Sequence, residues 1–140
     1  MKLRVISIGK FSLKALSPLC ADYTHRIKKY SNFEWIVVKS AAEISRKINS
    51  GDYTVVLDER GEEWSSKELA DWFAKQQLHA MPQITFCVGP AEGWPEEIRK
   101  RANKILSLSR MTLQHEQSLL ILLEQIYRAF TILKGEPYHK

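Results

Sequence analysis

The chain has 140 residues and a formal net charge of +5, with 44% hydrophobic and 26% charged residues. This composition excludes a disordered or fibrous chain, and the length predicts one domain over residues 1–140. Because no apolar run reaches the roughly 20 residues that cross a bilayer and no signal-peptide cleavage site follows the N-terminal stretch, we expect a cytoplasmic protein.

The first half of the chain alternates between strand and helix patterns. Residues 2–8 are β-branched and predict a strand, and the spaced apolar residues from Ser12 to about Tyr30 predict a helix. A strand at 33–38, a short helix at 41–48 and a strand at 53–58 follow. The strands are short and apolar, as strands of a buried parallel sheet are.

The second half continues this alternation. Ser65 and Glu68 have the spacing of a capping box, which predicts that a helix begins there and runs to about His79. The remaining elements are a strand at 83–88, a helix with Pro95 at its first position, a short strand at 104–108 and a helix from about Glu116 to Lys134. The alternation predicts an α/β fold, with a parallel five-stranded sheet between helix layers.

The last predicted helix is too apolar for a surface helix, because it carries two neighbouring apolar stripes. One stripe comprises Leu119, Leu122, Ile126, Phe130 and Leu133, and the other Leu120, Leu123 and Tyr127. Either the whole helix is buried inside one chain, or the first stripe faces the sheet and the second a partner subunit. We favour the partner, because a chain of this size has a small core.

Basic residues gather in two places, at Arg26, Lys28 and Lys29 and again at Arg99, Lys100, Arg101, Lys104 and Arg110. This pattern suits a polyanionic partner such as RNA, although solvated helix faces show the same clustering. No His or Cys spacing of a zinc site occurs, so no metal is predicted.

Three loops follow the carboxyl ends of predicted strands, which is the edge where open parallel sheets bind ligands. They are residues 58–61, 89–93 and 107–113. Their glycines allow close approach of the main chain to a ligand, or serve only as turn residues. Neither the dinucleotide-binding G-x-G-x-x-G nor the phosphate-binding G-x-x-x-x-G-K-[ST] occurs, which disfavours the common nucleotide enzymes.

Taken together, these loops and the C-terminal end resemble the ribosomal RNA large subunit methyltransferase H family, a branch of the SPOUT superfamily. The resemblance spans the chain. It rests on the opening Met1-Lys2-Leu3, Leu57-Asp58-Glu59-Arg60-Gly61, Val88-Gly89 with Glu92-Gly93, Leu108-Ser109 through Thr112-Leu113 with His115, and Glu124 to Ala129 with the ending Pro137-Tyr138-His139.

The resemblance implies a C-terminal trefoil knot and a homodimer that binds S-adenosylmethionine. The implied cofactor-binding residues are Leu57, Gly89, Leu108, Ser109, Arg110, Met111, Thr112 and Leu113. The implied substrate is a pseudouridine in 23S ribosomal RNA of the assembled ribosome, methylated on ring nitrogen 3. Tyr138 and His139 are the candidates for binding and orienting that base.

The sequence departs from the family pattern at three positions. Pro90 stands where a second glycine is common, Gln114 where a proline is usual, and Leu119 where an arginine is usual in the last helix. These departures support an alternative, a catalytically silent RNA-binding dimer. A further alternative is a small-metabolite α/β enzyme with Arg60 and the helix start near Pro95 as its anion site.

Overall fold

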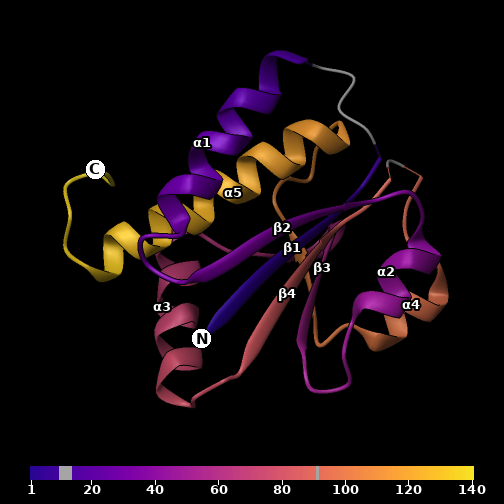
Figure 1. The fold of residues 1–140 in the computed structure, drawn as a ribbon, viewed down its shortest axis with the longest axis horizontal. Helices are drawn as coiled ribbons and strands as arrows, with labels where there is room; N and C mark the ends of the chain where they lie inside the picture. The colour runs from indigo at the N-terminus through magenta and orange to yellow at the C-terminus, as the bar shows by residue number, and fades with distance from the viewer. Residues whose placement is uncertain (10–13, 91) are drawn as a thin grey trace.

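The fold is that of a computed structural model, which describes residues 1–9, 14–90 and 92–140 (Figure 1). The strands are β1 (Lys2–Ile8), β2 (Asn32–Val38), β3 (Tyr53–Glu63), β4 (Gln83–Val88) and β5 (Lys104–Ser107). The helices are a 3₁₀ turn η1 (Lys14–Leu16), α1 (Ser17–Ile27), α2 (Ala41–Lys47), α3 (Ser66–Leu78), α4 (Glu96–Arg101) and α5 (His115–Leu133). The predicted order of elements is confirmed.

The five strands form one parallel sheet in the order β2-β1-β4-β3-β5. Figure 1 shows α1, α3 and α5 to one side of this sheet and α2 and α4 to the other. Each side has its own apolar cluster, since Phe86 packs with α1, α3 and α5 while the next residue, Cys87, packs with Ile44 of α2 and Ile98 of α4. The predicted sheet between helix layers is therefore confirmed.

Two helix boundaries follow from their capping residues. The capping box of α3 is present, because Ser65 Oγ accepts a hydrogen bond from Glu68 N (3.1 Å) and Glu68 Oε1 accepts one from Ser65 N (2.9 Å). Pro95 is the residue before α4 rather than its first helical residue. The predicted start of the first helix at Ser12 lies outside the described residues.

Strand β3 is longer than predicted, because it extends beyond residue 58 to Glu63. Leu106 of β5 pairs first with Leu57 and then, after a register shift, with Glu62. At the crossing, a Cβ on Gly61 would lie 2.6 Å from the carbonyl oxygen of Ile105. Only a glycine lets the two main chains approach this closely.

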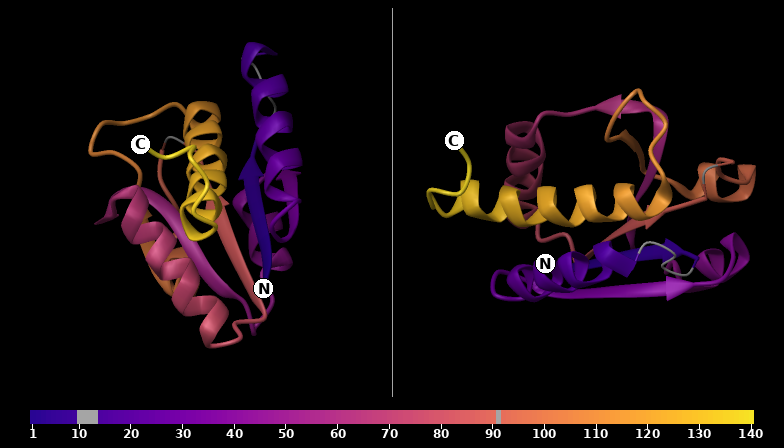
Figure 2. Two further views of the ribbon diagram at one scale, coloured as in Figure 1. Left: turned by 90° about the vertical axis from the view of Figure 1, so that its left-hand side faces the viewer. Right: turned by 90° about the horizontal axis from the view of Figure 1, so that it is seen from above.

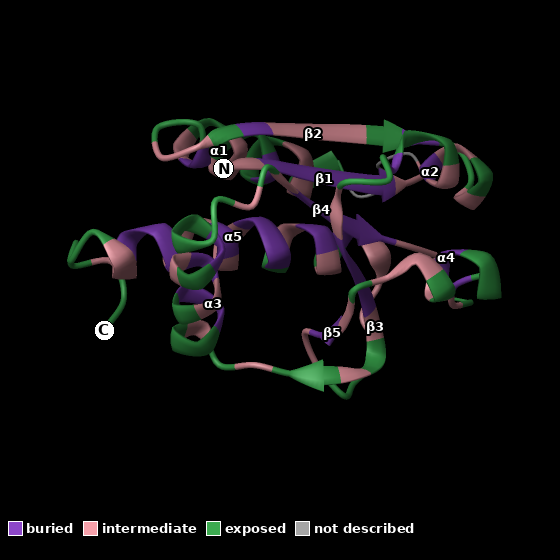
Figure 3. Cartoon of the chain, turned by 90° about the horizontal axis from the view of Figure 1, so that it is seen from below, coloured by how far each residue is buried: buried purple, intermediate pink, exposed green. Residues whose placement is uncertain are grey.

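Helix α5 is the most buried helix, as Figure 3 shows. Its first predicted stripe packs into the sheet-facing core, but Leu123 of the second stripe is also fully buried inside the chain. The prediction that Leu123 faces a partner is therefore wrong, because α1 and α3 flank the helix and cover more of its surface than one stripe. Leu120 and Tyr127 are half-buried.

In the described part of the chain, no helix combines the length and apolar character of a membrane span.

Candidate active site

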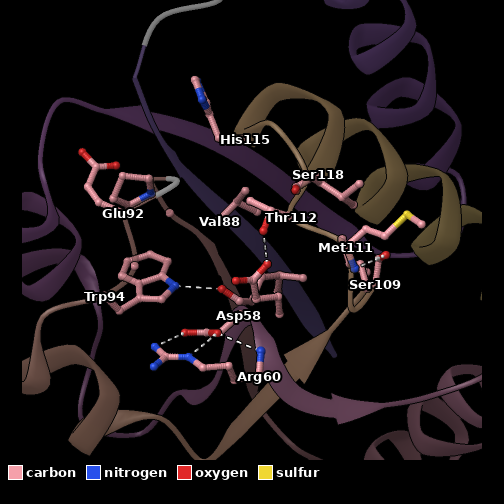
Figure 4. A pocket seen from close by; sticks show the side chains of 17 residues that line it. Asp58, Arg60, Val88, Glu92, Trp94, Ser109, Met111, Thr112, His115 and Ser118 are labelled. Carbon is pink, nitrogen blue, oxygen red and sulfur yellow. Dashed lines mark hydrogen bonds and ion pairs between the residues drawn. The ribbon is translucent and has the colours of Figure 1, made fainter.

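A cavity of about 300 Å³ opens at the carboxyl ends of β4 and β5 and beside residues 57–60 of the strand between them, β3 (Figure 4). Its volume is at the lower end of the range for small-molecule sites. It is lined by Leu57, Asp58, Glu59, Arg60, Val88, Gly89, Pro90, Glu92, Gly93, Trp94, Leu108, Ser109, Met111, Thr112, Leu113, His115 and Ser118. The three segments predicted as loops therefore meet in one place, but the prediction of a loop at 58–61 is wrong, because these residues belong to strand β3.

Seven of the eight residues predicted to bind the cofactor line this cavity, and they are Leu57, Gly89, Leu108, Ser109, Met111, Thr112 and Leu113. Arg110 does not line it, because its guanidinium turns outward to Glu63, with Nε 2.5 Å from the carboxylate. Only the main chain of Arg110, and not its side chain, is therefore a candidate for binding the cofactor.

Trp94 lines the cavity and contacts two of its other lining residues, Leu57 and Gly89. Its indole Nε1 donates a hydrogen bond to the Leu57 carbonyl oxygen (2.8 Å), as Figure 4 shows, and its ring lies against Gly89. The side chain is only 8% exposed, so this hydrogen bond is shielded from water. Trp94 thereby joins two predicted cofactor-binding residues, and sequence reasoning did not single it out.

The loop after β5 is held by short-range hydrogen bonds and by one contact across the cavity. Ser109 Oγ accepts from Met111 N (2.9 Å), and Ser107 Oγ donates to the Ser109 carbonyl (2.9 Å). Thr112 Oγ1 donates to Glu59 Oε2 (2.5 Å), which ties this loop to strand β3 (Figure 4). These hydrogen bonds hold the main chain of the loop in one conformation.

Of the two departures next to the cavity, Pro90 has a local structural role and Gln114 has no capping role. Pro90 lines the cavity and its carbonyl accepts a hydrogen bond from Gly93 N (3.2 Å), which closes the loop after β4. Gln114 directly precedes α5 and makes no capping hydrogen bond with its side chain. The third departure, Leu119, is buried in the core.

Asp58 is the main ionised group of the cavity wall. Arg99 Nη1 lies 2.6 Å from Asp58 Oδ2, and Arg60 donates from Nη2 (3.2 Å) and from its main-chain N (2.9 Å). Burial opposes ionisation of Asp58, but the hydrogen bonds from Arg60 and Arg99 outweigh it and lower the pKa to about 2. Asp58 therefore carries its negative charge at every physiological pH.

This low pKa predicts an acid-dependent loss of stability. A carboxylate whose pKa is lower in the folded state stabilises the fold above its unfolded value of about 4, and that contribution is lost as the pH falls towards 2. We expect urea unfolding between pH 5 and pH 2 to show a smaller loss in Asp58→Asn than in the unmodified chain. Substitution of the exposed Asp71 by Asn serves as the control, and an equal loss in both variants would contradict the assignment.

The predicted substrate-positioning residues lie elsewhere in the same chain. Tyr138 and His139 follow the C-terminal end of α5, whereas His115 at its N-terminal end lines the cavity. The 19 residues of α5 span roughly 28 Å, and Figure 2 shows the C-terminus at one end of this helix. Within one chain, the tail and the cavity are therefore not brought together.

Most residues of the second basic cluster are engaged by neighbouring groups of the chain, whereas the first cluster is mostly exposed. Arg99, Lys104 and Arg110 form ion pairs with Asp58, Glu62 and Glu63. Arg101 donates to the carbonyls of Ser45 and Ile48, and Arg26 pairs with Asp22. Lys28, Lys29 and Lys100 remain exposed. The second cluster is thus mainly structural, which the sequence pattern alone did not indicate.

Across residues 1–9, 14–90 and 92–140, no three His, Cys, Asp or Glu side chains converge as metal ligands would.

Comparison with known proteins places this architecture in a family. Residues 1–139 match the family described as "Predicted SPOUT methyltransferase". Proteins named ribosomal RNA large subunit methyltransferase H are similar over nearly their whole length: 39% identical in Geobacter metallireducens, over 99% of both chains. The counterpart in Thermus thermophilus is 38% identical, over 100% of this chain and 99% of that protein. The one in Koribacter versatilis is 37% identical, over 99% and 98%. The chain therefore belongs to the SPOUT methyltransferase family.

Proposed function

We propose that this chain transfers a methyl group from S-adenosylmethionine to ring nitrogen 3 of a pseudouridine in 23S ribosomal RNA, acting as a homodimer on the ribosome in the cytoplasm. The observation that carries the proposal is the cavity between β3 and the loops after β4 and β5, built from three segments far apart in sequence. The name of the relatives, ribosomal RNA large subunit methyltransferase H, supports the class of substrate.

The residues of the cavity fit such a cofactor in charge and in shape. Glu59 and Glu92 place carboxylates around it, which complements the positive charge of a sulfonium. The Asp58 carboxylate, by contrast, is already paired with Arg60 and Arg99. Gly89 and the ordered loop over 108–113 expose main-chain groups that can bind the adenosine and methionine portions. When bound, S-adenosylmethionine supplies a methyl group activated by its sulfonium. The trefoil knot stays a prediction from the family.

The position of the tail supports a homodimer. Roughly 28 Å of α5 separate Tyr138 and His139 from the cavity of their own chain. The tail of one subunit can therefore contact a substrate only at the cavity of the other subunit. Burial and the hydrogen bonds to Tyr23 and Glu124 raise the pKa of Tyr138, so its hydroxyl stays protonated. Tyr138 can therefore orient a base through its ring and hydroxyl but cannot remove a proton from it.

Complementation between two inactive variants tests this arrangement. One variant carries Gly89→Ala in the cavity and the other His139→Ala in the tail. If each site combines one chain's cavity with the other's tail, a mixed dimer contains one intact site of two, and purified mixed dimers should show about half of full activity. Methyl transfer to ribosomal RNA by affinity-purified mixed dimers is the measurement.

Homodimers of each variant, purified in parallel, serve as controls for residual activity. A mixed dimer as inactive as both controls would contradict a site shared between chains.

The activity itself is tested by mass spectrometry of ribosomal RNA incubated with the protein and labelled S-adenosylmethionine. Ribosomes, free large subunits and naked RNA are offered separately. We expect label on a single pseudouridine of 23S RNA. Absence of label together with absence of binding heat for S-adenosylmethionine in calorimetry would instead favour the silent RNA-binding dimer.

A further inference from the structure

The side chain of Arg128 is held in one orientation by its neighbours. Glu124 Oε1 accepts hydrogen bonds from Arg128 Nη2 (2.6 Å) and Nε (3.0 Å), one helical turn away on α5. The guanidinium also lies over the Tyr138 ring, with Cζ 4.7 Å from the ring centroid. One nitrogen, Nη1, is left to point at the tail.

That nitrogen contacts His139, with Arg128 Nη1 3.0 Å from His139 Nδ1. A guanidinium has only donors, so Nδ1 must accept this hydrogen bond through its lone pair. The single ring proton of the neutral imidazole then sits on Nε2. The contact with Arg128 therefore selects one of the two tautomers of His139 and leaves an N–H donor on the far side of the ring.

Tyr138 is fixed in the same cluster. Its hydroxyl donates to Glu124 Oε1 (3.1 Å) and lies 3.2 Å from the hydroxyl of Tyr23, and its ring meets Tyr127 edge-on at 4.8 Å. Glu124 thus binds both Arg128 and Tyr138. The tail that carries His139 is held by side chains of α5 and α1.

From this geometry we propose that His139 acts as a hydrogen-bond donor through Nε2–H to a carbonyl oxygen of the substrate base, and that Arg128 is the positioning residue that sets its tautomer. The inference rests on the proposed function and gives the substrate contact its chemistry, an imide nitrogen flanked by two carbonyl groups.

The methyl transfer needs His139 only as a hydrogen-bond donor and not as a base. The imide N–H loses its proton to water, and the resulting nitrogen lone pair attacks the methyl carbon. The new N–C bond forms as the C–S bond breaks, and its electron pair stays on sulfur in neutral S-adenosylhomocysteine. On deprotonation, negative charge spreads onto the carbonyl oxygens beside the nitrogen, where a placed N–H donor stabilises it.

Three substitutions of His139 separate a donor from a base. Gln carries an amide N–H₂ near the position of Nε2, Asn carries one near Nδ1, and Ala carries none. We expect His139→Ala and His139→Asn to lose about a hundredfold in kcat, the usual effect of removing one such donor, and His139→Gln to recover about tenfold of that loss. Equal losses in all three variants would overturn the donor role and indicate a general base, because none of Ala, Asn and Gln can take up a proton in place of His139.

The tautomer is measured directly by ¹⁵N chemical shifts of the histidine rings at about pH 8, where imidazoles are neutral. We expect an unprotonated Nδ1 and a protonated Nε2 for His139, and a shift towards mixed values in Arg128→Met. The exposed His25 is an internal comparison that Arg128→Met should leave unchanged. A protonated Nδ1 in the unmodified chain would overturn the positioning role.

The measurements allow the proposed function and the donor role of His139 to be rejected independently. If the unmodified chain places no methyl group on ribosomal RNA, the proposed function is wrong, whatever the tautomer. If it methylates the RNA but His139→Gln is no better than His139→Ala, the proposed function stands and the donor role is wrong.

Discussion

Substituting Gly89 by alanine is expected to weaken S-adenosylmethionine binding by about ten- to a hundredfold, because overpacking costs about 1–3 kcal/mol and each 1.4 kcal/mol is about tenfold in affinity. An added Cβ would lie 2.5 Å from Trp94 Cε2, closer than real Cβ contacts come, and Trp94 is buried with its Nε1 bonded to the Leu57 carbonyl. The indole must therefore shift and take Leu57 with it. Calorimetric titration with S-adenosylmethionine measures the effect.

Two further variants make this result specific. Gly51→Ala is the matched control, because an added Cβ there meets nothing within 4 Å, and its affinity should be unchanged. The double variant Gly89→Ala/Trp94→Leu relieves the overlap and should recover part of the lost affinity. Unchanged affinity in Gly89→Ala would show that the Gly89 and Trp94 contact does not shape the cofactor site.

The second large effect concerns stability, and it is expected at a buried ion pair away from the cavity. Asp52 accepts hydrogen bonds from Arg4 Nη2 (3.1 Å), Gln83 Nε2 (2.7 Å) and Thr85 Oγ1 (3.1 Å), and its side chain is 4% exposed. Asp52→Ala leaves the Arg4 charge buried without its counter-charge. We expect the free energy of unfolding to fall by about 3–5 kcal/mol.

Urea unfolding followed by circular dichroism measures this loss, with the denaturant dependence unchanged. Glu34→Ala provides the control, since Glu34 and Lys2 form an exposed pair 3.7 Å apart, which typically contributes under about 1 kcal/mol. A loss in Asp52→Ala as small as in this control would mean that water reaches Arg4 in the variant.

Much of the fold was predictable from the sequence because its signals are local. The capping box at Ser65 and Glu68 set the start of α3, and the short β-branched runs set the strands to within a residue or two. The extension of β3 to Glu63 was not predictable, since its polar residues pair with β5 across about forty positions of chain. Likewise, periodicity did not show that Leu123 is covered by helices on both sides.

For the candidate site, the loops at 89–93 and 107–113 were predictable because each follows a strand, whereas residues 58–61 lie inside β3. Their convergence depends on β4, β3 and β5 being neighbours, which the order along the chain does not reveal. Trp94 was missed because an indole bound to a main-chain carbonyl leaves no spacing signal. The distance between His139 and the cavity of its own chain was not predictable, because it depends on the direction in which α5 runs.

The length of α5 has a kinetic consequence. If the cavity and the tail of one chain are too far apart to cooperate, a lone subunit can still take up the methyl donor but has nothing to present the base. Turnover per subunit would then fall on dilution below the dissociation constant of the pair, while donor affinity would stay constant. Oligomer assembly would in this way act as an on–off control of catalysis, independent of how much donor is available.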